Sequence, residues 1–153
     1  MDVKLINPFI DATFNVLETM ASTKATAGKP YLKRDKTAQG DVTGIIGLTG
    51  ETRGTISISF TKNSILPIVS KMFGEEMKEL NDEIKDAVGE IANMISGQAR
   101  QGLEEMGRSL KAAIPTVIMG PNHTITHVTN YPIIAIPFTT GNGAFTIEVC
   151  FEE

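Results

Sequence analysis

Apolar residues recur at every third or fourth position in three stretches of the chain, the spacing of amphipathic helices. The first stretch covers residues 7–22, with Pro8 in its opening turn, where a proline interrupts no helical hydrogen bond. The second, shorter stretch begins at residue 63 or 64 and stops before Gly74, a residue type common at helix C-termini. The third and longest covers 81–109. We therefore expect two long helices and one short helix.

The longest predicted helix has one dry and one wet face. At about 100° per residue, its apolar positions point in nearly one direction; they are Ile84, Ala87, Val88, Ile91, Ile95, Gly102 and Met106. A polar set points away from this stripe and comprises Asp82, Asp86, Glu90, Asn93, Gly97, Arg100 and Glu104. The pattern predicts that the first set packs on a core and that the second faces water.

β-branched runs predict the strands. Runs at 41–49 and 54–60 flank the turn sequence Gly-Glu-Thr-Arg and predict a hairpin, and 54–60 alternates polar and apolar residues like a half-buried strand. Further strands are expected at 115–119, 123–128, 133–139 and 144–151. Residues 23–41 lack a sustained period and predict an extended, solvated connection with room for a short edge strand, in which the charged run 33–36 is a soluble loop.

The order of these elements favours an α+β fold. Two long helices are expected to pack on one face of a largely antiparallel sheet. A degenerate duplication of a helix-plus-hairpin unit accounts for the order helix, hairpin, helix, then helix and hairpins. A chain of 153 residues suits a single domain over 1–153 with one core.

Composition narrows the function classes. The net charge of −4 argues against nucleic acid and against an anionic membrane surface as partners. The single cysteine, Cys150, has no partner for an intrachain disulfide, and the start of the chain lacks the pattern of a signal peptide. No apolar run is long enough to span a membrane. We expect a cytoplasmic protein.

The wet face of the longest helix carries the best candidate chemistry. Glu90 and Asn93 are three positions apart, so their side chains are neighbours on one surface. A solvent-facing helix carries charges in any case, which is the simpler explanation of Glu90. Asn93 and Gly97 fit that explanation less well, because both residue types are unfavourable inside helices. A glycine at that position also allows another backbone to approach closely.

These residues resemble a known family. Asp86, Glu90 and Asn93, followed by Pro115, are similar to the signature of the CheC/CheX/FliY phosphatases of chemotaxis, which reads Asp or Ser, Glu, Asn and then a proline about twenty residues later. The likeness extends to the first helix, the first hairpin and the strand at 114–120, and the single motif copy favours the CheX branch. The resemblance implies the CheC-like fold and hydrolysis of an aspartyl phosphate on a CheY-type receiver domain.

The residue types suit that reaction. An acyl phosphate is already activated, so the catalyst chiefly needs to orient a water in line with the leaving carboxylate. The amide of Asn93 can accept one hydrogen bond from water and donate another without bringing negative charge to the phosphoryl group. The resemblance implies that Glu90 pairs with the receiver's lysine and fixes the docking register. Asp86 and Gly97 are expected to contact the partner.

Cofactors and partners follow from the same resemblance. Mg²⁺ is expected on the receiver domain, and we expect neither an intrinsic metal nor an organic cofactor. The resemblance also implies a homodimer formed by joining sheets, since terminal strands offer exposed edges. The competing hypothesis is a non-catalytic module that sequesters a phosphorylated receiver or joins a flagellar-switch or sensory complex.

Three other features are weaker candidates. The first helix carries Asp11, Asn15 and Glu18, but Asn and Glu stand in inverted order, so no site is assigned there. His123 and His127 lie four residues apart in a predicted strand, about 13 Å along it, which is too far to share a zinc ion. Cys150 points away from the apolar face of its strand and is interpreted as structural.

Overall fold

The computed structural model describes residues 3–38, 40–127 and 131–152. The helical elements are the 3₁₀ turn η1 (Val3–Leu5) and the helices α1 (Asn7–Ala21), α2 (Lys62–Phe73) and α3 (Asp82–Glu105). The strands are β1 (Thr26–Ala27), β2 (Tyr31–Lys33), β3 (Val42–Gly50), β4 (Gly54–Phe60), β5 (Leu110–Ala112), β6 (Thr116–Met119), β7 (Ile133–Thr139) and β8 (Ala144–Phe151).

The strands form one antiparallel sheet. Its path runs β1-β7-β8-β4-β3-β5, with β2 also paired to β7 and β6 also paired to β3. The hairpins β3–β4 and β7–β8 meet in the middle through β4 and β8, where Ile58 lies opposite Ile147. Each hairpin lies downstream of a long helix, α1 or α3, which fits the predicted helix-plus-hairpin unit.

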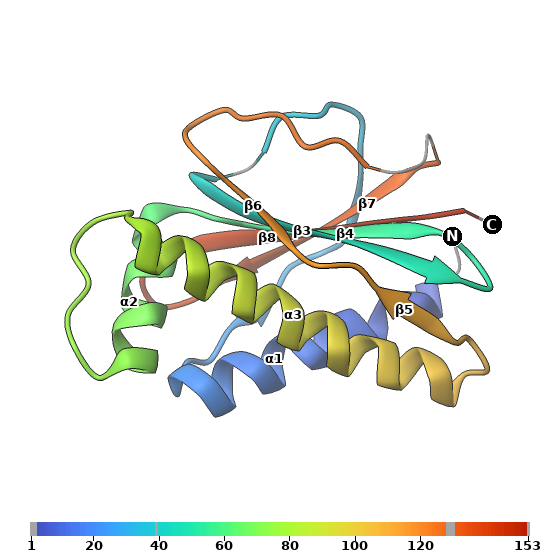
Figure 1. The fold of residues 1–153 in the computed structure, drawn as a ribbon, viewed down its shortest axis with the longest axis horizontal. Helices are drawn as coiled ribbons and strands as arrows, with labels where there is room; N and C mark the ends of the chain where they lie inside the picture. Colours follow the sequence, from blue (N-terminus) through green and yellow to red (C-terminus); the bar gives the residue numbers. More distant parts are fainter. Residues whose placement is uncertain (1–2, 39, 128–130, 153) are drawn as a thin grey trace.

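The helices cover one face of this sheet (Figure 1). Alternate strand residues from β3, β4, β7 and β8 point toward them and form the core with the dry faces of α1, α2 and α3. Phe14 of α1 meets Phe138 edge-on, and Phe9 packs beside Phe151. At Gly44 the helix α3 comes close to β3, since a Cβ there would lie 3.1 Å from the Cβ of Ala92. The predicted fold class is confirmed.

The second face of the sheet is covered as well. Figure 1 shows that the connection after β2 and the connection after β6 cross this face, on the side opposite the helices. They are joined by the bridge between Thr37 and Thr124, and Ile125 donates its backbone N–H to the carbonyl of Lys36 at 2.7 Å. All seven residues of β4 are consequently buried, including the hydroxyl residues Thr55 and Ser57. The prediction of a half-buried strand at 54–60 was therefore wrong.

Several predicted boundaries also require correction. The helix α3 ends at Glu105 rather than near residue 109, because Gly107 has a φ of +86° and the chain then enters β5. The helix α2 starts at Lys62, with the Thr61 hydroxyl accepting the N–H of Ser64 at 3.2 Å. The expected strand at 123–128 is an irregular segment over 123–127, and its last residue lies outside the described residues.

Candidate functional site

The helix α3 carries the predicted site on its exposed face. The Asn81 side chain caps the helix by accepting the N–H of Ile84 at 3.1 Å. Two acidic residues follow in the first turn, where their negative charge interacts favourably with the helix dipole. The predicted stripe is buried from Ile84 to Ile95 and continues through Ala99 and Leu103. Prediction erred at its far end, since Gly102 is half-buried and Met106 is exposed beyond the helix.

Glu90 and Asn93 lie exposed on this face and line the same hollow. The hollow has a volume of about 520 Å³ and is bounded by α3 and by the chain that enters β6. Its lining is formed by Lys85, Asp86, Gly89, Glu90, Asn93, Met94, Ile114, Pro115 and Val117. Asp86 therefore shares the surface of the two principal candidates. Gly97 lies one turn further along α3, outside this lining. A Cβ placed on Gly97 would lie 3.9 Å from a guanidinium nitrogen of Arg100.

The apolar half of the hollow depends on Gly89. A Cβ on this buried glycine would lie 3.4 Å from Val117 and 4.0 Å from Pro115, so the strand β6 packs directly on the helix there. The polar half consists of one cation, two carboxylates and one amide on the first half of α3. A carboxylate can only accept hydrogen bonds, whereas the amide of Asn93 can donate and accept. The arrangement can therefore bind a cation and orient a small polar molecule beside it.

Sequence reasoning missed part of this surface. Lys85 lies next to the recognised signature and enters the lining. Ile114 directly precedes the proline of the signature and is 89% exposed. The sequence shows only that Ile114 directly precedes the proline of the signature. A single apolar residue does not reveal whether its side chain is buried or exposed.

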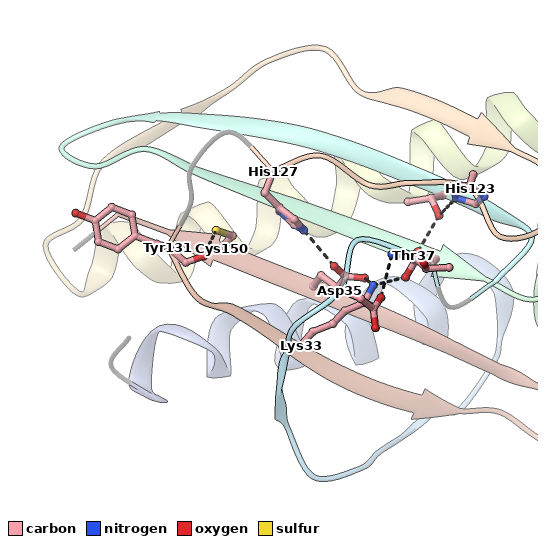
Figure 2. Close-up of polar contacts among 10 residues, drawn as sticks. Lys33, Asp35, Thr37, His123, His127, Tyr131 and Cys150 are labelled. Atoms are coloured by element: carbon pink, nitrogen blue, oxygen red, sulfur yellow. Dashed lines mark hydrogen bonds and ion pairs between the residues drawn. The ribbon is translucent and has the colours of Figure 1, made fainter.

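A second polar cluster lies buried on the opposite face of the sheet (Figure 2). Glu148 of β8 accepts from the Lys33 ammonium at 2.6 Å and contacts His127 Nε2 at 3.1 Å, with all three side chains at most 2% exposed. Lys33 also donates to the backbone carbonyl of Thr37. The prediction of a soluble loop at 33–36 was therefore wrong for Lys33, which belongs to β2 and is held by a buried ion pair.

Tyr31 borders this cluster. Partial burial raises the pKa of its phenol above the ordinary value of 10.0, and the negative charges of Glu148 and Asp35 raise it further. Cys150 is buried on the same face and donates its thiol to the carbonyl of Tyr131 at 3.2 Å. This contact fits the structural interpretation of the cysteine.

The two histidines have separate surroundings. The Nδ1 of His123 lies 2.5 Å from the carbonyl of Gly120 and its Nε2 contacts the hydroxyl of Thr43, whereas His127 contacts Glu148. Across 3–38, 40–127 and 131–152, no three His, Cys, Asp or Glu side chains are grouped so that they could hold a metal ion. In the same ranges, none of the helices is long and apolar enough to cross a membrane.

The helix α1 lines a different groove. A hollow of about 940 Å³ is lined by the start of α1 and by the second half of α3. Both Asp11 and Asn15 line it, and the amide of Asn15 donates to Gln98 across the two helices at 2.7 Å. Asn15, which precedes Glu18 instead of following a glutamate as in the family signature, thus links the two helices.

The helices on one face of an antiparallel sheet, with an acid and an amide one turn apart on the long helix, define a CheC-like protein. A solved CheC-like superfamily protein from Shewanella sp. PV-4 is 44% identical and superposes with a TM-score of 0.93, covering 100% of both chains. Residues 42–139 match the family model of the chemotaxis phosphatase CheX. The chain belongs to this family.

Two relatives carry functional names. The CheY-P phosphatase CheX of Thermotoga maritima is 28% identical over 121 residues, which are 78% of each chain. A CheX from Borrelia burgdorferi, solved in a complex with CheY, BeF₃ and Mg²⁺, is 28% identical with a TM-score of 0.82 and 97% coverage of both chains.

Proposed function

We propose that this chain hydrolyses the aspartyl phosphate of a CheY-type receiver domain. The observation that carries the proposal is the shared hollow of Glu90 and Asn93 on the exposed face of α3, in a chain of the CheX family. The relative from Thermotoga maritima is named a CheY-P phosphatase, and the Borrelia burgdorferi relative was solved bound to CheY. We also propose that this protein is located in the cytoplasm, together with its receiver.

Asn93 orients the attacking water. Its side-chain carbonyl accepts a hydrogen bond from the water, whose oxygen then forms a bond to phosphorus as the bond from phosphorus to the receiver's carboxylate oxygen breaks. The carboxylate leaves with the electron pair of that bond. Both hydrogens of the water end on the released inorganic phosphate. No covalent intermediate on this chain is needed.

Glu90 positions the partner. Glu90 lies between the exposed residues Asp86 and Asn93 on one face of α3, so its carboxylate can reach a lysine ammonium of the docked receiver and accept its hydrogen bonds. Such a charge pair fixes the register in which Asn93 enters the receiver's site. Asp86, one turn before Glu90 in the same lining, adds negative potential toward the same cation. Mg²⁺ belongs to the receiver in this proposal, as the composition of the Borrelia burgdorferi complex suggests.

We further propose that the chain forms a homodimer through the edge of the sheet made by β1 and β2. Tyr31 and Leu32 of β2 are 42% and 56% exposed, which leaves apolar area at an unpaired edge. Sedimentation equilibrium tests this proposal, with Leu32→Asp expected to favour the monomer. A monomeric wild-type chain at micromolar concentration would contradict it.

The phosphatase proposal is tested by the rate of phosphate release. A CheY-type receiver is phosphorylated with a small-molecule donor in Mg²⁺ and followed with and without this protein. Acceleration that disappears in Asn93→Ala and persists in Gln101→Ala, an exposed amide elsewhere on α3, supports the proposal. Binding without acceleration would identify the sequestering module instead.

A further inference from the structure

Ile114 is an unusually exposed apolar side chain. It is 89% exposed, whereas the other exposed large apolar residues of the described ranges are between 39% and 56% exposed. Single exposed apolar residues are common on proteins and need no special explanation. The position of Ile114 distinguishes it, because its side chain lines the hollow that also contains Glu90 and Asn93.

The backbone holds Ile114 in a fixed position. The preceding residue, Ala113, donates its N–H to the carbonyl of Gly47 at 2.9 Å. The following residue, Pro115, restricts Ile114 to extended backbone conformations. Thr116 then enters β6 in register with Ile45 of β3. A segment that is fixed on both sides loses little backbone freedom when its side chain binds a partner.

The surroundings of Ile114 combine apolar and charged groups. Met94, Pro115 and Val117 continue the apolar part of the lining beside the polar residues of α3. Charge pairs are strengthened when water is removed from them, and apolar contacts around a polar pair are what exclude water at protein interfaces. An apolar wall next to Glu90 would therefore act on the strength of any ion pair that Glu90 forms.

We propose that Ile114 is the apolar anchor by which this chain docks the receiver domain. It packs on an apolar surface beside the receiver's phosphorylated carboxylate and shields the Glu90 ion pair from bulk water. This inference rests on the proposed function and adds a residue to its docking surface. Asn93 acts on the reacting water, whereas Ile114 acts on the affinity of the complex.

A second copy of this chain is a poorer occupant of the surface. The exposed neighbours Lys111 and Thr116 are polar, so the apolar surface around Ile114 is limited to the small apolar part of the hollow. A stable interface buries about 800 Å² on each partner, which one exposed isoleucine beside a small apolar lining does not supply. A docking contact that continues into the polar hollow suits the receiver better.

The test separates affinity from catalysis. We expect Ile114→Ser to raise KM for the phosphorylated receiver about 10- to 100-fold, the factor expected from losing the burial of one large apolar side chain. The kcat should remain that of the wild type, and Ile114→Val should restore most of the affinity. Met106→Ser is the matched control, because Met106 is 44% exposed. It lies about 20 Å from Asn93 along α3.

The same variants are titrated with the beryllofluoride-loaded receiver in Mg²⁺, which measures binding without turnover. Wild-type protein that binds but does not accelerate phosphate loss would contradict the proposed function, while a weaker Ile114→Ser complex would still support the anchor. Unchanged KM and unchanged binding in Ile114→Ser would overturn the anchor alone. A change from dimer to monomer in Ile114→Ser, measured by sedimentation, would assign the surface to a second copy and overturn it too.

Discussion

Two polar regions of this protein illustrate opposite uses of polar side chains. The wet face of α3 keeps Glu90 and Asn93 in water, where neither needs a partner within the chain. The covered face of the sheet encloses Lys33 and Glu148, which are joined at 2.6 Å and almost inaccessible to solvent. Buried charges are tolerated only when they are paired and hydrogen-bonded. The first region is therefore available for a partner, and the second is committed to the fold.

The comparison predicts which property each region controls. Substitutions on the α3 face should change activity and leave stability nearly unaltered, because exposed side chains make few contacts within the chain. Substitutions in the buried cluster should change stability and leave the chemistry of the folded molecules unaltered.

Asn93→Ala should give the largest effect. If Asn93 orients the attacking water, its loss should lower the rate of receiver dephosphorylation by about 10²- to 10⁴-fold, the contribution of one positioned catalytic group. The free energy of unfolding should be unchanged or slightly higher, because alanine is the better helix former. Single-turnover phosphate release and urea denaturation measure the two quantities. A stability loss that parallels the activity loss would contradict the division.

Glu148→Ala should destabilise the fold by about 3–5 kcal/mol, since it leaves the Lys33 ammonium buried without its partner. Urea denaturation measures the loss, and hydrogen exchange at the Ile125 amide should accelerate, because His127 no longer holds the crossing segment to β8. The exposed pair Arg53 and Glu152, joined at 3.3 Å, provides the matched control. Its disruption by Glu152→Ala should cost less than about 1 kcal/mol.

The double variant Lys33→Met with Glu148→Leu sharpens this prediction. Replacing both charges by apolar side chains of similar size should recover the part of the lost stability that comes from the unpaired ammonium, whereas the loss of the His127 contact remains. An equal loss in the single and double variants would show that packing, rather than an uncompensated charge, dominates the effect. Activity of the folded double variant should equal that of the wild type.

Glu90→Ala should weaken the complex with the phosphorylated receiver by about 2–5 kcal/mol if its ion pair is desolvated on docking. Calorimetric titration with the beryllofluoride-loaded receiver measures this loss, and Glu104→Ala, another exposed acid of α3, is the control. The wild-type affinity should fall as salt is added, and Glu90→Ala should show a shallower dependence. A tight, salt-insensitive Glu90→Ala complex would contradict the proposed pairing.

The smallest effect should come from Tyr31 at the border of the buried cluster. Its pKa is raised in the folded protein, so folding favours the neutral phenol. Its contribution to stability is therefore complete below pH 10.0, the ordinary value, and disappears as the pH rises through the folded pKa. Urea denaturation above pH 10.0 should show a shallower fall in stability for Tyr31→Phe than for the wild type. An equal fall in stability in the two proteins would contradict this role of Tyr31.

Periodicity predicted most of the helical layer. The helices at 7–22 and 81–109 were predicted with their starts in place, because Pro8 in the first turn of α1, the Asn81 cap of α3 and a strict apolar period all act locally. The end of α3 was predicted too late. The helical spacing of apolar residues continues in the sequence to Met106, but Gly107 turns the chain with a positive φ. The strand β5 begins only three residues later and is too short to leave a period of its own.

The candidate site was predicted in part. The neighbourhood of Glu90 and Asn93 follows from helical spacing alone, and Asp86 follows from the same spacing. Ile114 and Val117 come from a segment more than twenty positions away along the chain, and only the packing of β6 on Gly89 brings them to α3. This contact depends on the pairing of β6 with β3 in the sheet, which a local sequence pattern does not predict.

The sequence by itself determined the fold class, the dry and wet faces of α3 and the polar pair that its wet face presents, because these depend on residue spacing along single elements. Tertiary structure decided which polar residues remain in water. The alternation in β4 and the charges at 33–36 are typical of solvated positions, yet Ser57 and Lys33 are buried. Two connections cross the face of the sheet opposite the helices. Burial depends on what covers a surface, and the covering segments are far away in the sequence.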